Sequence, residues 1–135
     1  MIPAGFLKAW AGAAALLLIV DAIWLGLVAR GFYVRQLGDL MLESPNLAVA
    51  ALFYVMYSAA VVILASGAAA RSGSLQDALL LGAILGFAAY GTYDITNLAT
   101  LKNWPLVMSL VDIAWGTVLT AAVSAVGFWL LRSSQ

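Results

Sequence analysis

Four apolar stretches, each about twenty residues or longer, dominate this chain of 135 residues; they cover about 9–29, 47–70, 76–98 and 106–131. A helix needs about 20 apolar residues to cross the roughly 30 Å hydrocarbon core of a bilayer. Each stretch is therefore predicted to be a membrane-spanning helix. The predicted fold is an all-α, integral membrane four-helix bundle that forms a single domain over 1–135. Four spans place both termini on the same side of the membrane.

The composition agrees with this class and excludes several others. Charged residues make up only 9% of the chain, against roughly 25% in soluble domains. Six basic and six acidic residues leave no net charge, which excludes the basic surface of a nucleic-acid-binding protein. The absence of Cys and His excludes disulfides, thiolate nucleophiles, His-ligated metal centres and the usual catalytic triad. We therefore expect neither a cofactor nor a metal ion.

The first stretch and the segment after it need separate interpretation. An apolar run this long, which carries Asp21 and is followed by Arg30, favours a retained helix over a cleaved secretory signal. The segment 30–46 is predicted to be a polar connection with a short interfacial helical turn over 38–42. Its aromatic pair, Phe32 and Tyr33, is typical of the aromatic belt at a membrane surface.

Capping residues mark where the later helices begin. Asn46 offers an N-cap for the second helix, and Ser74 with Asp77 forms a variant of the capping box before the third. Pro105 fits the first turn of the fourth helix, where proline is tolerated. Basic residues do not decide the orientation, because three flank each side of the predicted bundle: Lys8, Arg71 and Arg132 against Arg30, Arg35 and Lys102.

Small residues recur at helical spacing on the last two spans. Gly82 and Gly86 form a G-x-x-x-G motif on the third span, and Gly116, Thr120 and Ser124 form a stripe on the fourth. Small residues let membrane helices approach closely. We interpret these stripes as packing within the chain, with a homodimer interface as the alternative.

Three carboxylates lie inside the spans: Asp21, Asp94 and Asp112. Counting at about 1.5 Å per residue from Arg30 and Lys102 places all three very roughly 10–15 Å from the same membrane face. Ionised aspartates at such depths cost a few kcal/mol each on insertion scales, and the spans hold no Lys or Arg to neutralise them. We expect at least one to be protonated at neutral pH and to bond a Tyr or Asn.

Aromatic and polar residues are predicted to lie at the same depth as these acids. The candidate ligand-binding set is Asp21, Tyr54, Tyr57, Tyr90, Tyr93, Asp94, Asn97, Asp112 and Trp115. The first and fourth spans share the pattern V-D-x-x-W, at 20–24 and 111–115. Trp24 is interpreted as a belt or packing residue, whereas Trp115 is the better candidate for lining a cavity.

The segment AYGTYDITNLATL at 89–101, followed by Trp104-Pro105 and by VDIAWGT at 111–117, resembles the signature of a known family. That family consists of small bacterial membrane proteins described as a domain of unknown function, the 2177 family. The resemblance extends to Asp21, Trp24-Leu25-Gly26, Phe32-Tyr33, Leu37-Gly38 and Phe53-Tyr54, and so covers nearly the whole chain. It implies a four-span membrane protein without an assigned activity.

Three kinds of function stay open from the sequence. The first is an acidic and aromatic intramembrane pocket that binds a membrane lipid or small amphiphile, with Asp21, Asp94 and Asp112 as candidates for acid–base chemistry on it. The second is proton-coupled or cation-coupled transport, and the third is an accessory subunit of a larger membrane complex. A hard cation held by the three aspartates is a minor alternative. We expect a multi-pass protein of the bacterial inner membrane.

Overall fold

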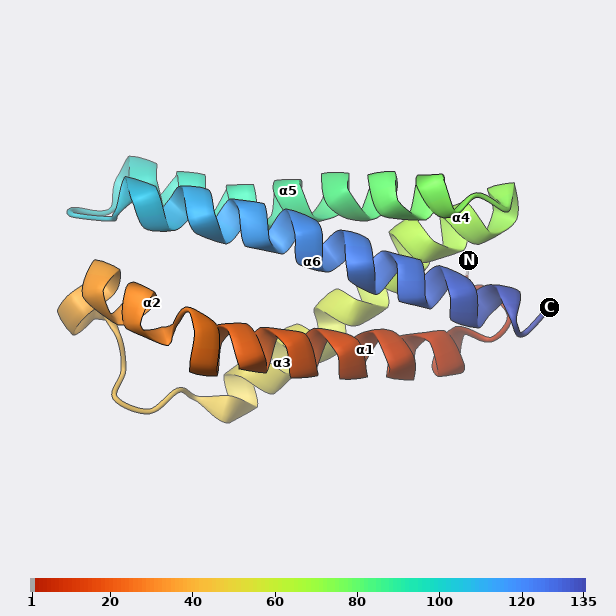
Figure 1. The fold of residues 1–135 in the computed structure, drawn as a ribbon, viewed down its shortest axis with the longest axis horizontal. Coiled ribbons are helices and arrows are strands. Elements are labelled where there is room, and N and C mark those ends of the chain that lie inside the picture. The colour runs from red at the N-terminus through yellow and green to blue at the C-terminus, as the bar shows by residue number, and fades with distance from the viewer. Residues whose placement is uncertain (1) are drawn as a thin grey trace.

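The computed structural model describes residues 2–135, which form helices joined by short turns and contain no strand (Figure 1). The first half comprises α1 (Phe6–Ile23), a π-helical turn η1 (Trp24–Val28), α2 (Arg30–Leu37) and a 3₁₀ turn η2 (Gly38–Leu40). It is followed by α3 (Leu47–Val61), a second π-helical turn η3 (Val62–Ser66), α4 (Gly67–Ser72), α5 (Leu75–Thr100) and α6 (Leu106–Arg132).

Four segments are long and apolar enough to cross a membrane: Phe6–Val28, Leu47–Ser72, Leu75–Thr100 and Leu106–Arg132. The prediction of four spans in a helical bundle is confirmed, and each end lies within three residues of its predicted position. Two of the predicted caps are present. The Asn46 side chain accepts a hydrogen bond from the Val49 amide at 3.2 Å, and Ser74 Oγ accepts one from the Asp77 amide at 3.1 Å.

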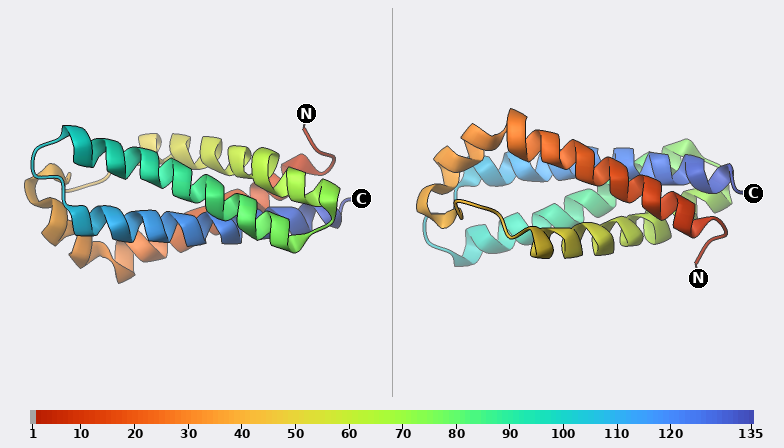
Figure 2. Two further views of the ribbon diagram at one scale, coloured as in Figure 1. Left: turned by 90° about the horizontal axis from the view of Figure 1, so that it is seen from above. Right: turned by 90° about the horizontal axis from the view of Figure 1, so that it is seen from below.

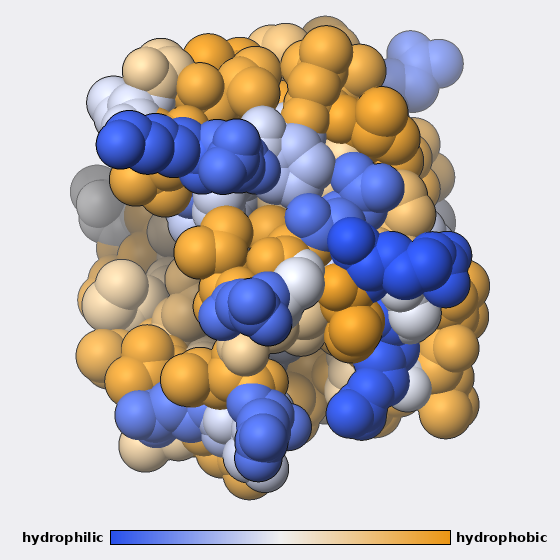
Figure 3. Space-filling model, turned by 90° about the vertical axis from the view of Figure 1, so that its left-hand side faces the viewer, coloured by the Kyte–Doolittle hydropathy of each residue, from blue (hydrophilic) through white to orange (hydrophobic). Residues whose placement is uncertain are grey.

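The two ends of the chain meet at one end of the bundle, where Lys8 Nζ donates a hydrogen bond to Ser133 Oγ at 2.8 Å (Figure 1). The opposite end is formed by α2, the connection that follows it and the turn between α5 and α6. Hydrophilic residues gather on this opposite end, with apolar residues between them (Figure 3). It has the mixed character of a surface at the edge of a membrane.

α6 is the central helix, since it packs against each of α1 to α5. Its partner α5 runs antiparallel beside it (Figures 1 and 2). The two backbones approach closely because glycines replace side chains at the seam: a Cβ added at Gly82 would lie 2.6 Å from Ser124 Cβ and 2.8 Å from the Thr120 carbonyl oxygen. This contact confirms that the small-residue stripes pack within the chain.

α2 corrects the prediction of a polar connection over 30–46, because Arg30–Leu37 is an α-helix. The Ala29 amide donates to the Trp24 carbonyl at 2.7 Å, which widens the helix into a π turn, and Ala29 itself then leaves the helical region at φ −109° and ψ 0°. The break turns α2 across the end of the bundle (Figure 1). Gly38, at φ +54°, ends it.

Tertiary packing explains why this short, polar segment is helical. Tyr33 is buried on α2 and forms a small apolar cluster with Ala29 and Met108. Side chains of Trp24, Phe32, Leu37 and Trp104 pack around that cluster. Isolated helices of eight residues are marginal, so these contacts stabilise α2. They place Tyr33 close to the acidic residues instead of in an aromatic belt.

Candidate functional site

Asp21 lies on the face of α1 that points into the bundle. It continues a buried row at a spacing of four residues, Ala9, Ala13 and Leu17, because residues four apart share one face of a helix. Its Oδ2 accepts a hydrogen bond from the Tyr54 hydroxyl of α3 at 2.6 Å, and its Oδ1 accepts one from Trp115 Nε1 of α6 at 3.0 Å. Both oxygens have a partner, and the residue is only 6% exposed.

Asp112 is held by a different pair of aromatic residues. The Tyr33 hydroxyl donates to Asp112 Oδ1 at 2.8 Å and accepts a hydrogen bond from Trp24 Nε1 at 3.3 Å. Burial raises the pKa of the Tyr33 phenol; among the smaller effects the Trp24 hydrogen bond lowers it and the Asp112 carboxylate raises it. The hydroxyl therefore keeps its proton at physiological pH and remains a donor.

The two hydrogen-bonded groups are joined by stacked indoles. The rings of Trp24 and Trp115 are nearly parallel, 6° apart, with their centroids separated by 4.2 Å. α1 and α6 run in opposite directions (Figure 1), so the two V-D-x-x-W segments meet head to tail. Trp115 of α6 therefore donates directly to Asp21 of α1. Trp24 donates to the Tyr33 hydroxyl, which in turn donates to Asp112 of α6. Trp24 stacks on Trp115 and donates to Tyr33, so of the two interpretations, belt or packing residue, the structure favours packing.

Asp94 differs from the other two acids. It is fully buried on α5, and neither of its carboxylate oxygens has a hydrogen-bond partner. The carboxyl of Asp112 lies beside it, close enough for the two groups to interact. Within residues 2–135 the acids do not gather into a group of three that could hold a metal ion. The site is therefore a pair, Asp94 with Asp112, next to a separate Asp21 centre.

The remaining predicted residues are brought to this region to different degrees. The Tyr57 hydroxyl lies 2.7 Å from Thr120 Oγ1 in a buried hydrogen bond, and the Tyr57 and Tyr90 rings meet edge to face at 6.2 Å. Tyr93 packs edge to face on Trp104 at 5.7 Å and is 56% exposed, so it lies at the margin. Asn97 is half-buried one turn beyond Asp94.

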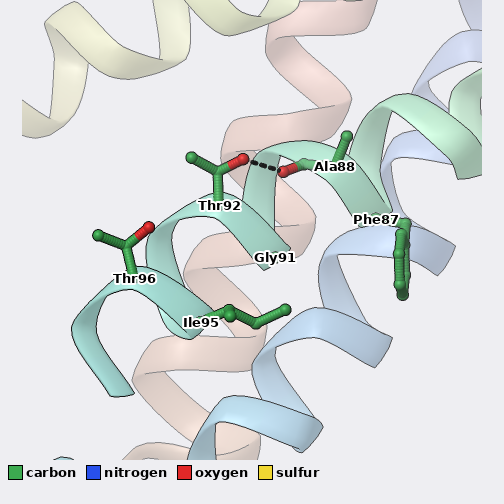
Figure 4. Close-up of a pocket in the computed structure, with 6 residues that line it drawn as sticks. All are labelled: Phe87, Ala88, Gly91, Thr92, Ile95 and Thr96. Carbon is green, nitrogen blue, oxygen red and sulfur yellow. Dashed lines mark hydrogen bonds between the residues drawn. The ribbon is translucent and has the colours of Figure 1, made fainter. Parts of the chain in front are cut away.

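The two clearest hollows in the described chain lie away from the acids. One is on α5 and is lined by Phe87, Ala88, Gly91, Thr92, Ile95 and Thr96 (Figure 4). In it Thr92 Oγ1 donates to the Ala88 carbonyl at 2.6 Å, which satisfies the hydroxyl within the helix. The other is lined by Ile2, Pro3 and residues 5–8. None of the three aspartates lines either hollow; Asp21 and Asp94 are buried, whereas Asp112 is half-buried.

The family model described as "Predicted membrane protein (DUF2177)" matches residues 6–129. The chain belongs to this family. No curated protein and no solved structure matches it. The four spans and the multi-pass topology of this DUF2177 member agree with the description, which assigns no activity.

Sequence reasoning missed two residues of this DUF2177 site, Tyr33 and Trp24. For Trp24 a signal was present, since V-D-x-x-W occurs on two antiparallel helices and lets each Trp face the Asp of the other. No such signal exists for Tyr33, because its position depends on the helix break at Ala29 and on the direction that α2 takes after it.

Tyr33→Phe is expected to lower the free energy of unfolding by roughly 1–3 kcal/mol, because two hydrogen bonds are lost and their partners stay behind. It removes the donor to Asp112 and the acceptor for Trp24 while keeping the ring in its apolar cluster. Thermal unfolding in detergent measures the change. Tyr93→Phe is the control, because that side chain is largely exposed. Equal losses for both variants would contradict the role given to the Tyr33 hydroxyl.

Proposed function

We propose that this protein binds a lipid or small amphiphile inside the membrane, with the polar head of the ligand at the Asp94–Asp112 pair. One observation carries the proposal: both oxygens of the fully buried Asp94 carboxyl lack a partner. A buried polar group left unsatisfied costs about 1–3 kcal/mol, and more when charged. A ligand that donates hydrogen bonds at Asp94 removes this cost.

The contrast with Asp21 supports a ligand role for Asp94 rather than a packing role. Asp21 is also buried, but the hydroxyl of Tyr54 and the indole of Trp115 occupy its two oxygens. Its place in the fold is explained by the three helices that it joins. Asp94 joins nothing by hydrogen bonds, and an ionisable residue in a membrane span without a structural partner is a functional candidate by default.

A ligand reaches the buried Asp94 past the half-buried Asp112 when the element that contacts Asp112 moves. In this proposal that element is α2, which is eight residues long and lies between the break at Ala29 and the glycine turn at Gly38. Its buried residue Tyr33 is the one that donates to Asp112. Outward movement of α2 breaks the two hydrogen bonds of the Tyr33 hydroxyl, to Asp112 and from Trp24, and uncovers Asp112.

We further propose the bacterial inner membrane as the location. Multi-pass α-helical bundles satisfy their backbone hydrogen bonds within each span, whereas outer-membrane proteins of bacteria are typically β-barrels.

Native mass spectrometry of the gently solubilised protein tests the ligand. We expect a bound lipid or amphiphile on the wild type that is lost in Asp94→Asn and in Asp112→Asn, both of which keep the side-chain shape. Asp39→Asn is the matched control, since Asp39 is exposed on η2. Circular dichroism establishes that all variants stay helical. A ligand retained in full by both site variants would overturn the proposal.

A further inference from the structure

We propose that the ligand head taken by the Asp94–Asp112 pair is a positively charged nitrogen that carries N–H donors, so that the ligand is an amphiphilic amine. This inference rests on the proposed function and names the class of its ligand. The hydrogen-bonding groups and the charges around the pair favour this class of ligand.

The pair offers acceptors that the described chain does not use. Asp94 has two free oxygens, and at Asp112 the Tyr33 hydroxyl occupies Oδ1. An ammonium group brings up to three N–H donors and an ester or alkyl chain brings none. A hydroxyl head brings a single donor and leaves at least one oxygen of Asp94 unsatisfied. The number of free acceptors therefore favours an ammonium head over an alcohol.

The charges near the pair lead to the same choice. The basic residues within the spans, Lys8, Arg71 and Arg132, lie at the other end of the bundle. Those on the side of the pair, Arg30, Arg35 and Lys102, are exposed at the end of the bundle. A carboxylate pair without a cation in a low-dielectric interior attracts a positive charge and repels a negative one. An anionic head such as a phosphate or a fatty-acid carboxylate is therefore excluded at this site.

The test compares two probes of equal chain length, dodecylamine and dodecanol, added to the protein in phosphatidylcholine nanodiscs at neutral pH. Tryptophan fluorescence reports binding, because Trp24 is linked to Asp112 through Tyr33. We expect the wild type and Asp39→Asn to bind the amine at least tenfold more tightly than the alcohol. In Asp94→Asn the two probes are expected to bind alike.

Three results would overturn the amine assignment. Equal affinities of the wild type for both probes, each weakened in Asp94→Asn, would leave the amphiphile site standing with a neutral head. An amine preference that survives in Asp94→Asn would place the cation site elsewhere. Failure of both probes to bind would also reject the amine; the mass-spectrometric lipid measurement then decides separately whether the proposed function stands.

Discussion

Gly86→Ala is expected to lower the free energy of unfolding by roughly 1–3 kcal/mol, the usual cost of overpacking a tight interior. A Cβ at this position overlaps the carbonyl oxygen of Gly116 and lies 2.7 Å from Thr120 Cβ. The carbonyl belongs to the α6 backbone and cannot rotate away. Thr120 is also restrained, because its Oγ1 is hydrogen-bonded to the Tyr57 hydroxyl at 2.7 Å. α5 and α6 must therefore separate to admit the methyl group.

Thermal or denaturant unfolding in detergent measures this loss. Gly26→Ala is the matched control, because no atom lies within 4 Å of the position that its Cβ would occupy. Substitutions at such open positions usually change stability by less than about 0.5 kcal/mol. Similar losses in the two variants would show that glycine itself, rather than the close approach of α5 and α6, sets the stability of the bundle.

The four spans were predictable because their signals are local. Each span is a continuous apolar run, and the caps at Asn46 and Ser74 are side chains that bond an amide three residues ahead. Neither signal depends on the rest of the chain. α2 could not be predicted in this way, since Arg30, Arg35 and Gln36 give its sequence the polarity of a connection. Its helix is stabilised by the contact of Tyr33 with Met108, which lies 75 residues away in the sequence.

That the acids lie near one another along the bundle was predictable, but their partners were not. Counting residues along each span predicts where each acid lies along the bundle axis. The hydrogen bonds of Asp21 with Trp115 and of Asp112 with Tyr33 show that these residues lie close together along that axis. Which face of a span points inward is harder to predict, because lipid and protein interior are both apolar and the usual contrast between faces is weak. The stacking of Trp24 on Trp115 and the lack of a partner for Asp94 depend on how each helix is rotated about its own axis.

Asp21→Ala and Asp94→Ala are expected to have opposite consequences although they delete the same group at similar depth. Asp21→Ala leaves the Tyr54 hydroxyl and the Trp115 N–H without their acceptor. Each unsatisfied donor costs about 1–3 kcal/mol, so we expect a loss of roughly 2–6 kcal/mol in the free energy of unfolding. Asp94→Ala removes a carboxyl that has no partner. Relief of its burial offsets the small cavity, and the free energy of unfolding is expected to change by less than about 1 kcal/mol.

Unfolding of both variants is measured in detergent after delipidation, so that a bound ligand does not stabilise the wild type. Asp21→Asn serves as the conservative variant and should recover part of the loss, because its amide oxygen still accepts one of the two hydrogen bonds. A loss in Asp94→Ala as large as that in Asp21→Ala would mean that Asp94 holds the helices together, and the argument for a ligand at its free oxygens would fail. If Asp94→Ala keeps the stability of the wild type but loses the bound amphiphile, the two aspartates have different roles. Asp21 then holds α1 against α3 and α6 by hydrogen bonds, and Asp94 binds the ligand.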